Sequence, residues 1–251
     1  MSRWKASGIH LALSAAIALA VVSLLALVWF PGPLFEATGS RELVMLLIAV
    51  DVTIGPVITL IVYRAGKRGM RFDLAVIALC QVAALAYGLH AFLATRPAFT
   101  VFAVDRFVVV PASQLAAEDL AAASDPAYRR IPWDGPKLVA AKLPQDPEEK
   151  QALLDSGLAG KDVERFPKYY ERYENQREQV LARARPLDDL GVLGGSAKAA
   201  LEEFVAAHGG DASAFVFLPL KIPRQDMIAV VRRADAAFEA MLPIEPPGRP
   251  R

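Results

Sequence analysis

The stretch IHLALSAAIALAVVSLLALVWF, residues 9–30, decides what kind of protein this is, because it contains no Asp, Glu, Lys or Arg. As an α-helix that rises about 1.5 Å per residue, it is long enough to cross a hydrocarbon core of about 30 Å. The apolar region of a cleaved secretory signal is shorter, at about 7–15 residues. We therefore expect an uncleaved first membrane span here.

Two more apolar runs follow the first. Residues 43–63 form a run that is interrupted by Asp51 and by the pair Gly55-Pro56, and residues 73–95 form another. The whole chain is 54% hydrophobic with a mean hydropathy of +0.31, and the excess lies in the first 95 residues. Soluble domains are usually about 45–50% apolar. The sequence thus predicts a membrane domain of three spans over residues 1–95.

Basic residues predict the orientation of these spans. The loop RAGKRGMR between the second and third spans carries four positive charges in eight residues, namely Arg64, Lys67, Arg68 and Arg71. The positive-inside rule places such a loop, together with the N-terminus, in the cytoplasm. Everything after the third span is then outside, which for a bacterial inner membrane means the periplasm.

Asp51 is the strongest polar signal within the predicted spans, because a carboxylate in the middle of a bilayer costs about 2.5–3.5 kcal/mol. It shares a helical stripe with Gly55, and Pro56 lacks the amide hydrogen that would continue the helix, so we expect a kink one turn beyond the acid. Three interpretations are open: a structural hydrogen bond to a neighbour such as Gln81, a docking point for a partner helix, or an ion path. The absence of a second acid at similar depth disfavours the ion path.

Residues 96–244 have a balanced charge and predict a periplasmic α+β domain with an antiparallel sheet. The apolar runs on either side of Asp105-Arg106 predict a first hairpin. The other predicted strands are 137–143, 214–220, 227–231 and 237–244, of which the last two form a hairpin with a helix open as the alternative. The predicted helices are 113–123, 147–154, 162–185 and 196–208. The tail, residues 245–251, contains three prolines and is predicted to be disordered.

Four aromatic residues gather in the predicted helix 162–185. Phe166, Tyr170 and Tyr173 follow one another at i, i+4 and i+7, and Tyr169 widens the stripe. Such a face packs onto a sheet more often than it recognises a partner. Both interpretations are open, and we treat the four residues as a possible partner surface.

The sequence offers little that could carry catalysis or hold a metal ion. Cys80 is the single cysteine, so a disulfide within the chain and a zinc site built from cysteines are excluded. The histidines His10, His90 and His208 belong to distant segments, and no hydrolase, zinc or nucleotide-binding motif occurs. We expect a protein without enzymatic activity, cofactor or small-molecule substrate.

The overall charge excludes a further class of partner. The 28 Lys and Arg residues nearly balance the 27 Asp and Glu residues, which leaves a formal net charge of +1. Nucleic-acid binding needs a basic patch or stripe, and after the basic loop at residues 64–71, which is assigned to the membrane edge, the sequence does not carry one.

Four motifs give the chain a family resemblance. They are RWKASGIH at 3–10, WFPGPLF at 29–35, DVTIGP at 51–56 and KRGMRFDLA at 67–75. In this order they resemble the type IV pilin accessory protein family (TfpX/TfpZ type), with the densest match over residues 3–110. The resemblance implies an inner-membrane protein that acts with a cognate type IV pilin and assists its assembly into pili, and it carries over no catalytic residues.

Two other functions stay open beside this one. A membrane-anchored sensor or checkpoint of pilin level would need a cytoplasmic output domain, and residues 64–71 are too few to hold one. A membrane enzyme that modifies pilin would need a constellation of catalytic side chains, which the predicted spans lack. We therefore expect non-catalytic contacts with the bilayer and with pilin.

Overall fold

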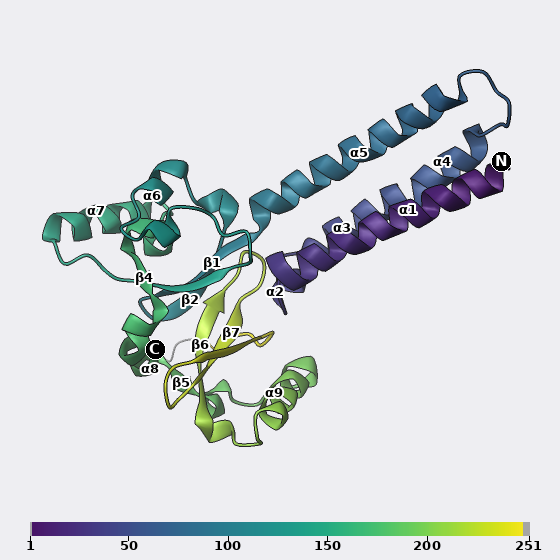
Figure 1. Cartoon of the computed structure of the whole chain (residues 1–251). Coiled ribbons are helices and arrows are strands. Elements are labelled where there is room, and N and C mark those ends of the chain that lie inside the picture. The colour runs from purple at the N-terminus through teal and green to yellow at the C-terminus, as the bar shows by residue number, and fades with distance from the viewer. Residues whose placement is uncertain (1, 248–251) are drawn as a thin grey trace.

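The computed structural model describes residues 2–247, which form a helical arm, residues 3–95, and a sheet domain that follows it (Figure 1). Of the tail predicted to be disordered, residues 248–251 lie outside the described residues. Residues 245–247 have no regular secondary structure.

The arm contains three helices that are long and apolar enough to cross a membrane, Arg3–Trp29, Ser40–Val62 and Met70–Thr95. Each overlaps a predicted span and begins a few residues earlier. The elements of the arm are α1 (Arg3–Leu24), the π-helical segment η1 (Leu25–Trp29), α2 (Leu34–Ala37), α3 (Ser40–Ile48), the π-helical segment η2 (Ala49–Ile54), α4 (Gly55–Val62) and α5 (Met70–Thr95).

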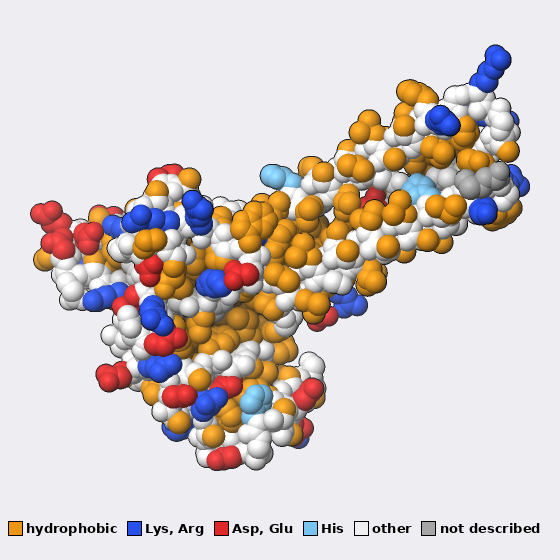
Figure 2. Space-filling model, in the orientation of Figure 1, with side chains coloured by type: hydrophobic (Ala, Val, Ile, Leu, Met, Phe, Trp, Pro, Cys, Tyr) orange, Lys and Arg blue, Asp and Glu red, His pale blue; other side chains and the backbone are white. Residues whose placement is uncertain are grey.

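The surface of the arm differs from that of the sheet domain. Figure 2 shows hydrophobic side chains over the visible face of the arm, whereas charged side chains gather over the sheet domain and at the free end of the arm. Large apolar side chains such as Leu19, Leu27 and Leu79 are exposed along the helices of the arm. Exposed apolar surface of this extent is typical of a face that meets lipid or a partner protein.

The sheet is mixed, which corrects the antiparallel sheet that the sequence predicted. Its order is β4-β3-β1-β2-β6-β7-β8, with β5 pairing to β6. The pairs β1–β3 and β2–β6 are parallel, and the other pairs are antiparallel. The strands are β1 (Pro97–Ala103), β2 (Arg106–Pro111), β3 (Lys137–Ala141), β4 (Tyr170–Arg172), β5 (Arg185–Pro186), β6 (Phe215–Lys221), β7 (Met227–Arg232) and β8 (Phe238–Leu242).

The helices of the sheet domain agree with the sequence except in one region. They are α6 (Ala117–Ala121), α7 (Pro147–Leu158), α8 (Arg177–Arg183) and α9 (Gly195–Ala207). The prediction of a single helix over 162–185 is wrong. That segment forms two 3₁₀ turns, strand β4, a third 3₁₀ turn and then α8. Pro167 begins the second of these turns, and a proline inside a helix removes a hydrogen bond and clashes with the preceding turn.

One hydrophobic cluster joins the arm to the sheet domain. Phe30 and Phe92 of the arm meet edge to face with ring centroids 6.1 Å apart, and they belong to the same buried cluster as Phe102 and Phe107 of the first hairpin. A second cluster lies around β1, β3 and β4, and a third lies between α9 and strands β6 and β7. The arm is therefore fixed to the sheet by shared packing.

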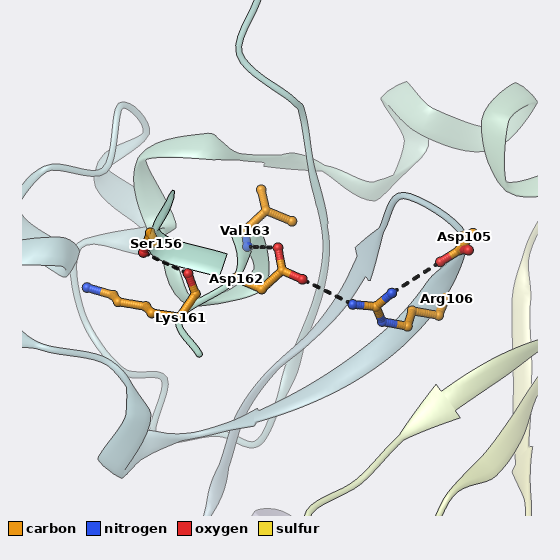
Figure 3. Close-up of polar contacts among 6 residues, drawn as sticks. All are labelled: Asp105, Arg106, Ser156, Lys161, Asp162 and Val163. Atoms are coloured by element: carbon orange, nitrogen blue, oxygen red, sulfur yellow. Dashed lines mark hydrogen bonds and ion pairs between the residues drawn. The ribbon is translucent and has the colours of Figure 1, made fainter. Parts of the chain in front are cut away.

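The hairpin of β1 and β2 turns at Val104 and Asp105, one residue earlier than predicted. The Arg106 guanidinium lies between two carboxylates, 3.4 Å from Asp105 and 3.2 Å from Asp162, as Figure 3 shows. In the same segment the Ser156 hydroxyl donates to the Lys161 carbonyl at 2.8 Å. The contact between Arg106 and Asp162 ties the hairpin to the loop that follows α7.

Candidate functional site

Asp51 lies in the middle of the second long helix and at its irregular turn. It is eleven residues from each end of the segment Ser40–Val62 and belongs to the π-helical segment η2. The sequence predicted a kink one turn beyond the acid, which stays a prediction; the π-helical turn itself includes the acid. Turns of this kind inside α-helices occur frequently at functional sites.

A chain of hydrogen bonds beside Asp51 connects the three long helices of the arm. The Gln81 amide nitrogen on α5 donates to the backbone carbonyl of Asp51 at 3.0 Å, and Gln81 Oε1 lies 2.5 Å from His10 Nε2 on α1. The other ring nitrogen, Nδ1, lies 2.6 Å from the Thr59 hydroxyl on α4. Because Gln81 Oε1 can only accept, His10 donates from Nε2.

Gly55 and Pro56 shape the space around this chain. A Cβ atom on Gly55 would lie 2.1 Å from Gln81 Nε2, so only glycine lets the Gln81 amide approach. The Pro56 carbonyl accepts a hydrogen bond of 2.9 Å from the Ser7 hydroxyl on α1. Both residues named from the sequence therefore help to hold α1, α4 and α5 together.

The Asp51 carboxyl takes no part in that network. Its side chain is only 8% exposed, and among the described residues Oδ1 is a buried oxygen without a hydrogen-bond partner. A structural bond to Gln81 was one of the three interpretations left open by the sequence, and the structure places the Gln81 bond on the Asp51 backbone carbonyl. The carboxyl lines a groove between α1 and α5, with a cavity volume of about 140 Å³.

The four basic residues predicted to set the orientation lie together at the free end of the arm, three in the loop between α4 and α5 and Arg71 in the first turn of α5. Arg64, Lys67, Arg68 and Arg71 are exposed, and Lys67 Nζ lies 2.5 Å from Asp73 Oδ2. Figure 1 shows the N-terminal end of α1 beside this loop. All the predicted topology signals are thus at one end.

The opposite end of the arm is held by a contact that the sequence analysis missed. The Arg96 guanidinium carbon lies 5.2 Å from the ring centroid of Trp29 and 4.4 Å from that of Trp133. The Trp29 indole also donates to the Trp133 carbonyl at 3.1 Å. Arg96 is 4% exposed, and this burial lowers the pKa of its guanidinium. The position of Trp29 at the end of an apolar span could have indicated this junction from the sequence, because tryptophan is common at the ends of membrane spans.

The four aromatic residues of the possible partner surface do not share one face. Tyr170 and Tyr173 are buried in the core, where burial raises the pKa of both phenols, and each donates a hydrogen bond to a backbone carbonyl. Their burial contradicts a role in partner contact. Phe166 and Tyr169 are half-buried, lie beneath Lys161 and Lys168 respectively, and remain a prediction as partner residues.

Within residues 2–247 no three His, Cys, Asp or Glu side chains come close enough to hold a metal ion. The polar groups that converge are those of the arm, namely one chain of hydrogen bonds and one carboxyl at the floor of an apolar groove. This arrangement suits contact between helices.

Comparison with known proteins adds a family. Residues 1–39 match the family model described as fimbrial assembly protein FimB. A fimbrial assembly protein of serogroup I from Dichelobacter nodosus is 30% identical over 185 residues, which cover 73% of this chain and 72% of that protein. Another from the same organism, of serogroups C1 and C2, is 31% identical over 118 residues, 46% of this chain and 90% of that protein. No solved structure matches this chain significantly.

Proposed function

Because this chain belongs to the family of fimbrial assembly proteins, we propose that it is an inner-membrane accessory protein for a cognate type IV pilin. It assists the assembly of that pilin into pili through non-catalytic contacts. The observation that carries the proposal is the similarity to relatives named for fimbrial assembly, which extends over about three quarters of the chain.

The arrangement of charged and apolar surface supports a membrane location. Three apolar helices lie side by side, and all their basic residues except Arg41 lie at one end while the sheet domain lies at the other. With the basic end in the cytoplasm, the sheet domain is periplasmic. A pilin that waits in the same bilayer with its head in the periplasm would then meet both parts of this protein.

Two reporter fusions test the location. A phosphatase that is active only in the periplasm, joined after Arg96, should be active, and the same enzyme joined at Gly69 should be inactive. The reverse pattern would contradict the orientation and the periplasmic sheet domain.

A domain exchange tests the role toward pilin. A protein that discriminates between pilins needs a surface on which it contacts the part that differs, and we expect the sheet domain to carry that surface. Replacing residues 96–251 by those of a relative should therefore change which pilin is assembled. If the choice of pilin follows residues 1–95 instead, the arm and not the sheet domain determines which pilin is recognised.

A further inference from the structure

The sheet domain places one large aromatic side chain at the level where the long helices of the arm end. Trp133, in the loop 131–136 that precedes β3, is 66% exposed. Single exposed apolar side chains are common on proteins and need no explanation. The position of this one is informative, because contacts with the ends of two long helices fix it.

Three contacts hold the loop 131–136 against the end of the arm. The Trp29 indole donates to the Trp133 carbonyl at 3.1 Å, and the Arg96 guanidinium carbon lies 4.4 Å from the Trp133 ring centroid. A Cβ atom on Gly135 would lie 2.6 Å from the Val28 carbonyl oxygen, so only glycine lets the loop backbone lie this close to the first long helix. Trp29 is the last residue of that helix, and Arg96 caps the end of α5. The loop therefore has a fixed height along the arm.

The length of the first long helix gives that height. The helix Arg3–Trp29 has 27 residues and is about 40 Å long at 1.5 Å per residue. A bilayer is about 40–45 Å thick with its headgroup layers, of which about 30 Å is hydrocarbon. The two ends of a helix of this length lie in the two headgroup layers. Trp4, which is 67% exposed, lies at one end, and Trp29 and Trp133 lie together at the other.

Tryptophan is well suited to this depth. Its ring is apolar and its indole N–H donates a hydrogen bond, so the side chain favours the boundary between acyl chains and water. Trp29 is 4% exposed and its indole is bonded within the chain, which leaves Trp133 as the ring that the surroundings can reach. Figure 2 shows hydrophobic side chains that continue from the arm onto the adjoining part of the sheet domain. The surface around Trp133 is thus continuous with the surface that would face lipid.

We propose that the loop 131–136 is a membrane-contact site of the sheet domain, with Trp133 inserted into the headgroup layer of the periplasmic leaflet. The ring lies against the upper acyl chains, and its N–H donates to the ester and phosphate oxygens of the lipids. Arg96 is 4% exposed and stacks on the ring, so it is a positioning residue for Trp133. The inference rests on the membrane location in the proposed function. It adds a fixed orientation of the sheet domain, beside the place where a pilin head leaves the bilayer.

Fluorescence quenching of the full-length protein tests the proposal, in bilayers of phosphatidylethanolamine and phosphatidylglycerol. The chain has three tryptophans, so in Trp4→Phe only the buried Trp29 and the exposed Trp133 remain. Lipids that are brominated near the headgroup end of their acyl chains should quench the emission strongly, and iodide in the water should quench it weakly. Adding Trp133→Phe should remove most of the quenching by lipid.

A tryptophan far from the arm is the matched control. Leu158→Trp, in a chain that also carries Trp4→Phe and Trp133→Phe, places an indole on α7, where Leu158 is 89% exposed. Figure 1 shows α7 on the side of the sheet domain away from the arm. This indole should be quenched by iodide and not by brominated lipid. Equal quenching patterns for Trp133 and the control, whichever quencher acts, would overturn the loop as the membrane contact.

The role of Arg96 is tested with the same quenchers. Arg96→Lys in the Trp4→Phe chain removes the planar group that stacks on the Trp133 ring. Quenching by iodide should then rise and quenching by lipid should fall. An unchanged pattern would overturn Arg96 as the positioning residue.

A tryptophan on the arm separates this inference from the proposed location. Leu79 is 69% exposed on α5, and Leu79→Trp in the chain without Trp4 and Trp133 should be quenched by brominated lipid. Lipid quenching at position 79 but not at Trp133 would overturn the loop contact and leave the membrane location standing. A lack of lipid quenching at both positions would overturn the membrane location itself.

Discussion

Gln81 donates to the backbone carbonyl of Asp51 over 3.0 Å and so leaves the Asp51 carboxyl free of that amide. The same amide side chain accepts from His10, which makes Gln81 the bridge between α1, η2 and α5. The arrangement divides two roles between neighbouring groups. The amide holds the helices together, and the carboxyl faces the groove.

Gly55→Ala should destabilise the arm by about 1–2 kcal/mol. This loss is expected even though alanine has the higher helix propensity, by about 1 kcal/mol relative to glycine. The new methyl group would lie 2.1 Å from Gln81 Nε2 and force that amide off its partners. Thermal unfolding of the purified protein in detergent measures the loss. Gly8→Ala on α1 is the matched control, because nothing lies within 4 Å of its Cβ position, and it should be neutral or stabilising.

A double variant identifies the cause of the Gly55 effect. In a Gln81→Ala background the amide is absent, so Gly55→Ala should cost little more than Gly8→Ala. A full additional loss in that background would show that Gly55 acts through a contact other than Gln81.

Arg96→Lys should weaken the junction between the arm and the sheet domain by about 1–2 kcal/mol, because lysine keeps the charge but cannot stack its head on two indole rings. The exposed Arg130→Lys is the control and should leave stability unchanged. Thermal unfolding and the rate of proteolysis between α5 and β1 measure the difference. Equal behaviour of the two variants would contradict the role given to the Arg96 contact with Trp29 and Trp133.

Tyr173→Phe should lower stability by about 1–3 kcal/mol, because the buried Ala236 carbonyl loses the hydrogen bond of 2.7 Å that the phenol donates. Tyr169→Phe removes a hydroxyl from a half-buried ring and should change stability little. Urea unfolding of the two variants compares them. A larger loss of stability for Tyr169→Phe than for Tyr173→Phe would contradict the role given to the hydrogen bond from Tyr173 to Ala236.

Alkaline pH should also destabilise the fold through the two buried tyrosines. Burial raises the pKa of Tyr170 and Tyr173 in the folded state, so the unfolded chain releases these protons more readily. Stability should then fall as the pH rises above about 10, the ordinary pKa of tyrosine. Tyr170→Phe should reduce this pH dependence. A dependence unchanged by the substitution would place its origin in other groups.

The sequence predicted the helices of the arm well, because a long apolar run without charges has few alternatives. It failed over 162–185, where Phe166, Tyr170 and Tyr173 have helical spacing but Pro167 lies between them. There the proline outweighs the periodicity. The parallel pairs β1–β3 and β2–β6 join strands that are not consecutive in the chain, and local patterns carry no information on such pairing.

The site was predicted in part. Asp51, Gly55, Pro56 and Gln81 were visible because each is unusual in an apolar run, and the structure gathers all four in the arm. His10 was missed, since only the packing of α1 against α4 and α5 brings it to Gln81. The junction at Arg96 depends on Trp133, which is 104 residues from Trp29 in sequence and lies beside it in the fold.

The central claim is that the chain is needed to assemble its pilin, and counting surface pili by electron microscopy tests it most directly. The comparison is between a strain that lacks this chain and the same strain carrying it again, with pilin synthesis held equal. The account predicts that most pili are lost without the protein and return with it. Pili in normal number and length without the protein would contradict the account.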